Sequence, residues 1–295
     1  MSLRALYDLP APAKLNLFLH VIGRRADGYH LLESVFVLID WADTLHLELR
    51  DDGRLQRHDL GDPLPADDLC LRAARALQTA SGTTLGADIS ILKSVPSGAG
   101  MGGGSSDAAT VLLALNRLWR LDWPRERLLP LAATLGADVP FFVFGRPALV
   151  QGIGEQLSAV EVPEQRFFVV KPAASLPTAD IFRSPLLKRD SASVIVMGSL
   201  ESTALTGLCS GFGRNDLQAA AEDRCVEVAQ AARWLEQRFG NSRMTGSGSA
   251  VFARVGTGDP PMATGLVEAS SELPAGWVGR LCRSLNQNPL AGWAG

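Results

Sequence analysis

Residues 94–109 read Ser-Val-Pro-Ser-Gly-Ala-Gly-Met-Gly-Gly-Gly-Ser-Ser-Asp-Ala-Ala, with five glycines in the seven positions 98–104. The segment lies between a predicted strand at 89–91 and a predicted helix that begins near Ser105. Glycine permits positive φ and close backbone approach, so successive amide groups can point into one concavity. The free N–H groups at the start of the helix add the positive end of its dipole. The segment therefore predicts an anion site, with a phosphate chain as ligand.

The backbone amides and hydroxyl groups of this loop are the candidate phosphate contacts. The residues concerned are Pro96, Ser97, Gly98, Ala99, Gly100, Met101, Gly102, Gly103, Gly104, Ser105 and Ser106. The hydroxyl groups of Ser105 and Ser106 can donate hydrogen bonds or ligate Mg²⁺.

Other interpretations of the loop are weaker. Linkers are marked by composition, and a linker would not be followed at once by a well-patterned helix. Gly98, Gly100 and Gly103 match the dinucleotide pattern G-x-G-x-x-G, but Asp122, at the spacing of the expected acidic residue, ends no predicted strand. The Walker pattern needs a Gly-Lys pair, which the chain lacks. The loop therefore predicts a phosphate site of neither common type.

Hydrophobic periodicity outside the loop predicts both strands and helices. At 14–21 every second residue is apolar, which predicts a strand with Lys14 and Asn16 on one face. Further strands are predicted at 32–39, 44–49, 89–91, 167–170, 251–255 and near the C-terminus, and helices at 68–78, 105–119, 124–136, 216–239 and 261–271. The mixture indicates an α+β fold.

Length and composition are those of a globular protein. The 295 residues suffice for two modest domains, and the polar stretch 161–166 marks a predicted boundary between a domain at 1–160 and a domain at 161–295. Apolar residues make up 46% of the chain and charged residues 20%. The net charge of −3 gives no support for nucleic-acid binding, which requires a basic face.

Membrane and redox features point to the cytoplasm. No apolar run approaches the ~20 residues of a membrane helix, and the first ten residues lack the layout of a signal peptide. Cys70, Cys209, Cys225 and Cys282 are far apart and form no Cys-x-x-Cys motif. We therefore expect a cytoplasmic protein with reduced thiols and no membrane or nucleic-acid partner. The pattern makes no prediction of the oligomeric state.

Two further segments accompany the glycine loop in a fixed order. Pro-Ala-Pro-Ala-Lys-Leu-Asn-Leu-Phe-Leu precedes it at 10–19, and Met-Thr-Gly-Ser-Gly-Ser-Ala-Val-Phe-Ala follows it at 244–253. Together the three resemble the motifs of the kinase superfamily named for galactokinase, homoserine kinase, mevalonate kinase and phosphomevalonate kinase. The resemblance covers about residues 10–285. It implies an ATP- and Mg²⁺-dependent kinase, with a ribosomal-protein S5-like N-terminal domain and a ferredoxin-like C-terminal domain.

Other segments resemble one branch of that superfamily. They are Arg-Ala-Asp-Gly-Tyr-His at 25–30, Leu-Gly-Ala-Asp-Val-Pro-Phe-Phe at 135–142, Pro-Thr at 177–178 and Ile-Phe at 181–182. The branch acts on a cytidine-diphosphate-linked derivative of methylerythritol, in the non-mevalonate route to isoprenoid precursors. The resemblance therefore implies a small-molecule substrate that is phosphorylated on its 2-hydroxyl group.

The resemblance places Lys14 and Asp138 at the reacting groups. A carboxylate can accept the proton of the attacking hydroxyl group, and an adjacent ammonium can stabilise charge on the transferred phosphoryl group. Without the resemblance, the commoner roles are a solvent-facing lysine and a helix N-cap aspartate.

The resemblance also implies substrate contacts. Tyr29 would stack on cytosine, His30 would hydrogen-bond the base, and Phe182 would close the other side. Thr178 could bind a substrate hydroxyl group or serve a turn, and Phe182 could equally belong to the core. Asn16 shares the face of Lys14 and could bind substrate, or be a satisfied polar residue near a sheet edge.

Several alternatives stay open beside this interpretation. The second glycine loop, 245–249, could wall the site or form a tight turn into a strand. A sister kinase for mevalonate, homoserine or a sugar would have no base to stack on Tyr29 and Phe182. A dinucleotide-binding oxidoreductase and a catalytically inactive relative are further alternatives. No residue set marks an adenine pocket or a metal site.

Overall fold

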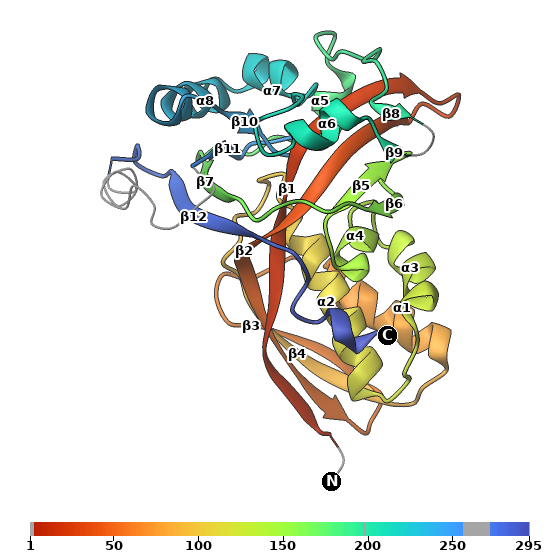
Figure 1. Cartoon of the computed structure of the whole chain (residues 1–295). Helices are drawn as coiled ribbons and strands as arrows, with labels where there is room; N and C mark the ends of the chain where they lie inside the picture. Colours follow the sequence, from red (N-terminus) through yellow and green to blue (C-terminus); the bar gives the residue numbers. More distant parts are fainter. Residues whose placement is uncertain (1–2, 197–198, 256–271, 295) are drawn as a thin grey trace.

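The molecule is built on one long β-hairpin, drawn in red and orange in Figure 1. The computed structural model describes residues 3–196, 199–255 and 272–294. Strands β1 (Ala5–Arg24) and β2 (His30–Arg50) form the hairpin and pair antiparallel, with several register shifts. The predicted strand at 14–21 is confirmed as the central part of β1, which extends well beyond it at both ends.

Strand β2 joins the two halves of the sheet. Three strands from distant parts of the chain pair with successive stretches of it: β5 (Ala148–Gln151), β12 (Val278–Leu285) and β4 (Gly86–Leu92). Because β12 also pairs with β7 (Arg166–Lys171), the sheet continues into the C-terminal half. In the described residues the ten-stranded sheet runs β10-β11-β7-β12-β2-β4-β3, with β1 and β5 also paired with β2, and β6 paired with β5.

The remaining strands are short. In the main sheet they are β3 (Leu55–Asp59), β6 (Gln156–Ala159), β10 (Arg243–Met244) and β11 (Val251–Arg254). Strands β8 (Ile195–Val196) and β9 (Ser199–Leu200) form a separate pair.

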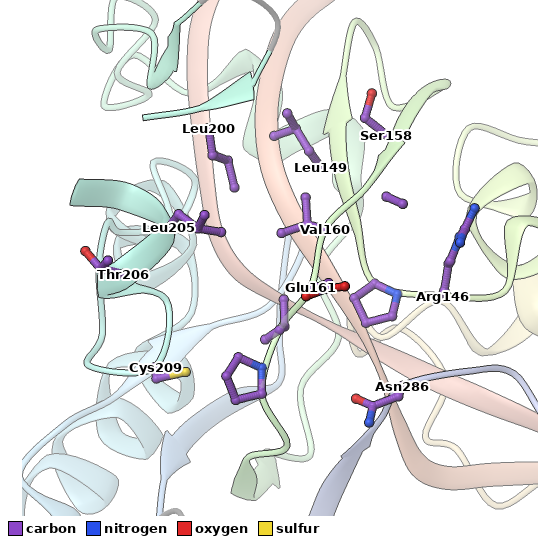
Figure 2. A pocket seen from close by; sticks show the side chains of 14 residues that line it. Arg146, Leu149, Ser158, Val160, Glu161, Leu200, Leu205, Thr206, Cys209 and Asn286 are labelled. Carbon is purple, nitrogen blue, oxygen red and sulfur yellow. The ribbon is translucent and has the colours of Figure 1, made fainter. Parts of the chain in front are cut away.

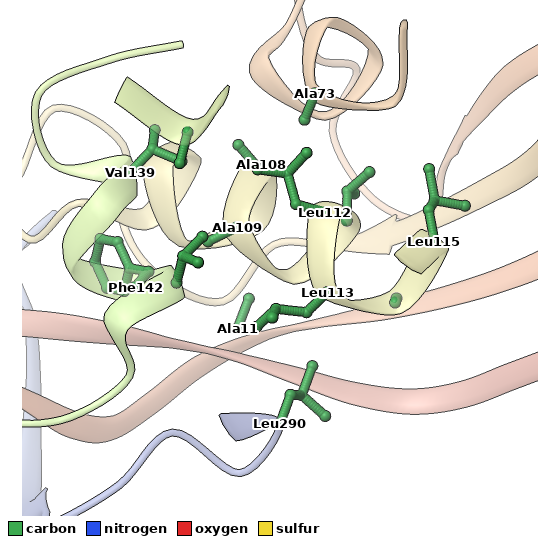
Figure 3. Packing of buried hydrophobic residues seen from close by; sticks show 14 of the residues in the cluster. Ala11, Ala73, Ala108, Ala109, Leu112, Leu113, Leu115, Val139, Phe142 and Leu290 are labelled. Atoms are coloured by element: carbon green, nitrogen blue, oxygen red, sulfur yellow. The ribbon is translucent and has the colours of Figure 1, made fainter. Parts of the chain in front are cut away.

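Helices α1 to α4 lie against the part of the sheet formed by β1, β2 and β4 (Figure 1). They are α1 (Leu69–Ser81), α2 (Gly103–Leu118), α3 (Arg125–Ala133) and α4 (Val139–Phe144). Twelve of the sixteen residues of α2 are buried, and eight of these twelve are apolar. Figure 3 shows Leu112 on the side of α2 toward Ala73 of α1, and Leu113 on the side toward Ala11 of β1. Helix α2 is therefore central to this layer.

The C-terminal half has an apolar cluster of its own. Helices α7 (Gln218–Arg224) and α8 (Val226–Phe239) pack on β7, β10 and β11. The short helices α5 (Thr178–Arg183) and α6 (Ser202–Gly207) lie in the segment between β7 and α7. Strands and helices are thus mixed throughout, and the predicted α+β class is confirmed.

After β12 the chain returns to the N-terminal half. A 3₁₀ helix, Ala291–Trp293, packs against α2, and Leu290 belongs to the same buried cluster as the residues of α2. Arg125 donates a hydrogen bond of 2.5 Å to the carbonyl group of Ala291. The last residues of the chain therefore stabilise the layer that carries the glycine loop.

Three predicted elements differ in the structure. The strands expected at 32–39 and 44–49 are one strand, β2, because the residues between them stay extended through their pairing with β1. The helix expected at 216–239 is broken at Cys225, whose backbone is extended with φ −142° and ψ 103°. The helix expected at 261–271 lies outside the described residues, and the short helix α4 was not predicted.

No helix in the described part of the chain combines the length and apolar character needed to span a membrane.

We expect the substitution Leu112→Ala to lower the free energy of unfolding by about 2–5 kcal/mol, because it opens a cavity between α1 and α2. Leu112 is 0% exposed, whereas Leu186, at 52%, is a matched control whose replacement by alanine should have little effect. Urea denaturation of both variants measures the difference. Equal destabilisation by the two substitutions would contradict the central position of α2.

Candidate active site

The glycine loop connects β4 to α2 and has the backbone geometry that its composition predicts. Gly98, Gly100 and Gly102 have φ of 63°, 72° and 73°, and Gly102 is the N-cap residue of α2. Between them, the side chains of Ala99 and Met101 are buried in an apolar cluster. The non-glycine residues thus anchor the loop to the core, while the glycines allow its turns.

The loop forms one wall of a cavity of about 380 Å³. The predicted residues from Pro96 to Ser105 line it, and the other walls are formed by Leu64, Pro65, Asp68, Leu69, Cys70, Lys93, Val95 and Asp107. Ser106 is fully buried, and its hydroxyl group donates to the carbonyl group of Pro12 at 2.7 Å. Of the two predicted serines, Ser105 is therefore the one that reaches the cavity.

The second glycine loop packs directly behind the first. The amide of Ser249 donates to the carbonyl group of Gly98, and the amide of Ala250 to that of Ala99, both at 3.1 Å. A Cβ atom on Gly100 would lie 2.3 Å from the carbonyl oxygen of Thr245. The loop at 245–249 therefore supports the first loop through backbone contact, a role that sequence reasoning did not separate from a simple turn.

Lys14 and Asp138 come together at the end of the glycine loop. Lys14 is only 2% exposed, and its Nζ lies 3.7 Å from Oδ2 of Asp138. Its backbone amide donates to the carbonyl group of Met101, and a Cβ atom on Gly102 would lie 3.4 Å from its Cγ. Burial lowers the pKa of Lys14, and the carboxylate of Asp138 opposes that shift.

Asp138 occupies the N-cap position of α4. Within the described residues, its carboxylate caps none of the N–H groups of the helix, so the capping role considered for it is not the one observed. The side chain is 34% exposed. One face of the carboxylate is thus open to an incoming hydroxyl group, while the other faces the ammonium group of Lys14.

Asn16 connects Lys14 to the second glycine loop. Its Oδ1 accepts hydrogen bonds from Nζ of Lys14 at 2.7 Å, from the hydroxyl group of Thr245 at 2.9 Å and from the amide of Gly246 at 2.8 Å. Its side-chain amide donates to Ser34 at 3.0 Å. Asn16 is therefore a satisfied buried residue that also holds the ammonium group of Lys14 in place.

His30 and Phe182, two of the three residues predicted to bind a base, come together at one end of α5. The rings of His30 and Phe182 stack with centroids 5.1 Å apart and an interplanar angle of 26°. Tyr29, the residue before His30, is 60% exposed. Thr178 lies four residues before Phe182 and therefore on the same face of α5. Its hydroxyl group is 2.7 Å from that of Ser247. Helix α5 thus links the aromatic pair to the second glycine loop.

A buried charge cluster in the cavity wall was missed by sequence reasoning. The ammonium group of Lys93, at the end of β4, contacts the carboxylates of Asp43 and Asp107, the latter at 2.5 Å. Burial raises the pKa of Asp107 to about 8, although Lys93 opposes the shift. Oδ1 of Asp107 finds no hydrogen-bond partner among the described residues. Asp43 is distant in sequence, so only the position of Asp107 beside the loop could have indicated the cluster.

A larger cavity, of about 1150 Å³, lies away from the glycine loop (Figure 2). Its walls are mainly apolar and come from the β5–β6 region and the segment around α6, with Leu149, Val160, Leu200 and Leu205 prominent. The charged and glycine-rich groups gather at the smaller cavity. The types of residue that line the two cavities, rather than the cavity volumes, therefore place the candidate active site at the glycine loop.

The described residues hold no group of three or more histidine, cysteine, aspartate or glutamate side chains suited to a metal ion. The oxygen donors among the side chains that line the cavity are the hydroxyl groups of Ser97 and Ser105 and the carboxylates of Asp68 and Asp107. Such a sparse set fits Mg²⁺ that takes most of its ligands from phosphate groups and water.

Sequence comparisons identify close relatives over the whole chain. The family model described as GHMP kinases N terminal domain matches residues 68–146. A 4-diphosphocytidyl-2-C-methyl-D-erythritol kinase of Methylibium petroleiphilum is 61% identical over 295 residues, with 100% of both chains covered.

Structural comparisons agree with the sequence. A crystal structure of 4-(cytidine 5'-diphospho)-2C-methyl-D-erythritol kinase is 34% identical, with a TM-score of 0.78 over 94% of this chain and 98% of that chain. Homoserine kinase from Cytophaga hutchinsonii is 16% identical, with a TM-score of 0.69 over 96% of this chain and 95% of that chain. The second likeness shows a shared fold.

We expect Gly100→Ala to separate the two glycine loops, because its Cβ atom would collide with the backbone of Thr245. The clash should lower the free energy of unfolding by about 1–3 kcal/mol and weaken nucleotide binding. Gly82→Ala is the matched control, since Gly82 has φ 69° but no atom within 4 Å of the added Cβ. Urea denaturation and the KM for ATP of both variants test this, and equal effects of the two would contradict it.

Proposed function

Because the chain belongs to the 4-diphosphocytidyl-2-C-methyl-D-erythritol kinases, within the GHMP kinases, we propose that it transfers the γ-phosphoryl group of ATP to the 2-hydroxyl group of 4-diphosphocytidyl-2-C-methyl-D-erythritol. The chain is an ATP-dependent small-molecule kinase of isoprenoid precursor biosynthesis. The observation that carries the catalytic assignment is the contact between Lys14 and Asp138 at the N-terminus of α2.

In the proposed reaction, Asp138 orients the 2-hydroxyl group and accepts its proton as the oxygen attacks the γ-phosphorus. The ammonium group of Lys14 stabilises the negative charge on the transferred phosphoryl group. Asn16 keeps that ammonium in place by accepting one of its hydrogen bonds. Since both charged groups are already in contact, little rearrangement is needed when the substrates bind.

The phosphate groups of ATP would lie against the glycine loop, where the amides of the loop and the first turn of α2 can donate to them. Mg²⁺, bound chiefly by these phosphates and assisted by Ser105, would neutralise part of their charge. The apolar wall around Leu64 and Leu69 suits the flat face of adenine. This extends the site beyond the sequence prediction, which indicated no adenine pocket.

The cytidine end of the substrate would bind at the other side, with its base stacked between Tyr29 and Phe182 and the edge of the base against His30. Aromatic stacking of a base contributes about 1–3 kcal/mol. Thr178, hydrogen-bonded to Ser247, lies between this end and the glycine loops. Its position suits a contact with the sugar alcohol or the diphosphate.

We propose the finer organisation as well: a ribosomal-protein S5-like domain at 1–160 and a ferredoxin-like domain at 161–295, with the substrate cleft between them. The separate apolar clusters around α2 and around α8 support this division. We also propose that the enzyme works in the cytoplasm, where its four free thiols would stay reduced.

A substrate panel tests the proposed function. With ATP and Mg²⁺, we expect phosphorylation of 4-diphosphocytidyl-2-C-methyl-D-erythritol and no turnover of mevalonate or homoserine, because only the first substrate has a base to bind the aromatic residues. CMP should compete with the productive substrate. Turnover of mevalonate or homoserine, together with indifference to CMP, would instead indicate a sister kinase.

We expect Asp138→Asn to lower kcat by about 10²- to 10⁴-fold, because the amide cannot accept the hydroxyl proton. ATP binding should persist, since the glycine loop is untouched. Asp223→Asn, an exposed position in α7, is the control and should keep normal activity. Steady-state kinetics and calorimetric titration with ATP measure both. Near-normal turnover of the Asp138 variant would disprove the proposed base.

A further inference from the structure

Arg189 lies in the segment after α5, and its guanidinium group makes four hydrogen bonds. Its Nε donates to Nε2 of His30 at 3.2 Å. Its Nη1 donates to the carbonyl group of Leu187 at 3.1 Å, and its Nη2 to those of Phe182 at 3.2 Å and Ser184 at 3.0 Å. One side chain therefore connects the ring of His30, on β2, to the backbone that carries Phe182.

This contact determines the protonation state of His30. A guanidinium group has only donors, so the ring nitrogen that faces it must present a lone pair. His30 is therefore neutral, with its proton on Nδ1. The charged groups that face the ring are Arg189 from the segment after α5 and Arg24 from β1, and both are positive. Together with burial, the main cause, they lower the pKa of His30.

We propose that Arg189 is a positioning residue that holds His30 as a fixed Nδ1–H donor, parallel to Phe182, for recognition of cytosine. This inference rests on the proposed function of the site. Cytosine presents two adjacent acceptors, N3 and O2, whereas uracil has a donor at N3. A donor held in one tautomer at that edge favours cytosine, and a ring free to exchange tautomers does not.

The tautomer can be observed directly. The chain has four histidines, so nitrogen NMR of histidine-labelled protein gives few signals, and the variant His30→Gln assigns one of them. We expect a protonated Nδ1 and a bare Nε2 for His30 in the wild type. In Arg189→Ala the proton should move largely to Nε2, which is the favoured tautomer of a free imidazole. A wild-type ring protonated on Nε2 would overturn the proposal.

Kinetics test the consequence for binding. At about pH 8, Arg189→Ala should raise the KM for the cytidyl substrate roughly tenfold and leave kcat nearly unchanged, since one hydrogen bond to the base is lost. Its preference for CMP over UMP as a competitor should fall. Arg183→Ala, at an arginine with a side chain that is 77% exposed, is the control and should keep wild-type values.

The pH dependence separates positioning from a merely structural role. Removing Arg189 removes a positive neighbour, so the pKa of His30 should rise toward its ordinary value of about 6.5. As pH falls from about 8 to about 6, His30 in the variant gains a second proton, Nδ1 again carries hydrogen, and KM should recover. The KM of the wild type should stay flat over this range.

Arg189→Lys keeps a positive donor and tests the proposal again if the alanine variant folds poorly. It should retain the Nδ1–H tautomer with a smaller rise in KM. An unchanged KM in Arg189→Ala, or a rise that is equal at all pH values, would overturn the role of Arg189 while the proposed function stands. Failure of the wild type to phosphorylate the cytidyl substrate would overturn the proposed function itself, and NMR would still report the tautomer.

Discussion

The buried ammonium group of Lys14 imposes the main constraint on this structure. A buried charge is tolerated when it is paired and hydrogen-bonded, and here Asn16 and Asp138 provide those contacts. Asn16 in turn is held by Thr245 and Gly246 from the other end of the sequence. The requirement to satisfy one charge thus brings three distant segments together at the end of the glycine loop.

The long hairpin makes this convergence possible. Strand β1 carries Lys14 and Asn16, and β2 begins at His30 and pairs with strands from both halves of the chain. The phosphate end and the base end of the proposed site therefore lie on neighbouring strands of one sheet. Helix α5 provides a second link, from Ser247 of the second glycine loop to the aromatic pair. A rigid connection of this kind fixes the positions of two substrates relative to each other. Such positioning is the main contribution that a protein makes to phosphoryl transfer.

The two glycine loops have different structural roles. The first lines a cavity and is anchored by the buried side chains of Ala99 and Met101. The second supports it from behind, at a separation too small for any side chain at Gly100. The N-terminus of α2 and the amino group of Lys14 lie at one place, where burial lowers the pKa of Lys14 and the carboxylate of Asp138 opposes that shift.

Local pattern was enough to predict the glycine loop, the central part of β1, helix α2 and the shared face of Lys14 and Asn16, because each depends on residues near in sequence. The contact of Lys14 with Asp138 was implied only by family resemblance. The tertiary structure decided four other features: the unbroken β2, the break in the helix at Cys225, the cluster of Lys93 with Asp43 and Asp107, and the hydrogen bond from Arg189 to His30. These features arise from pairing and charge satisfaction between residues far apart in the chain, which periodicity and composition do not encode.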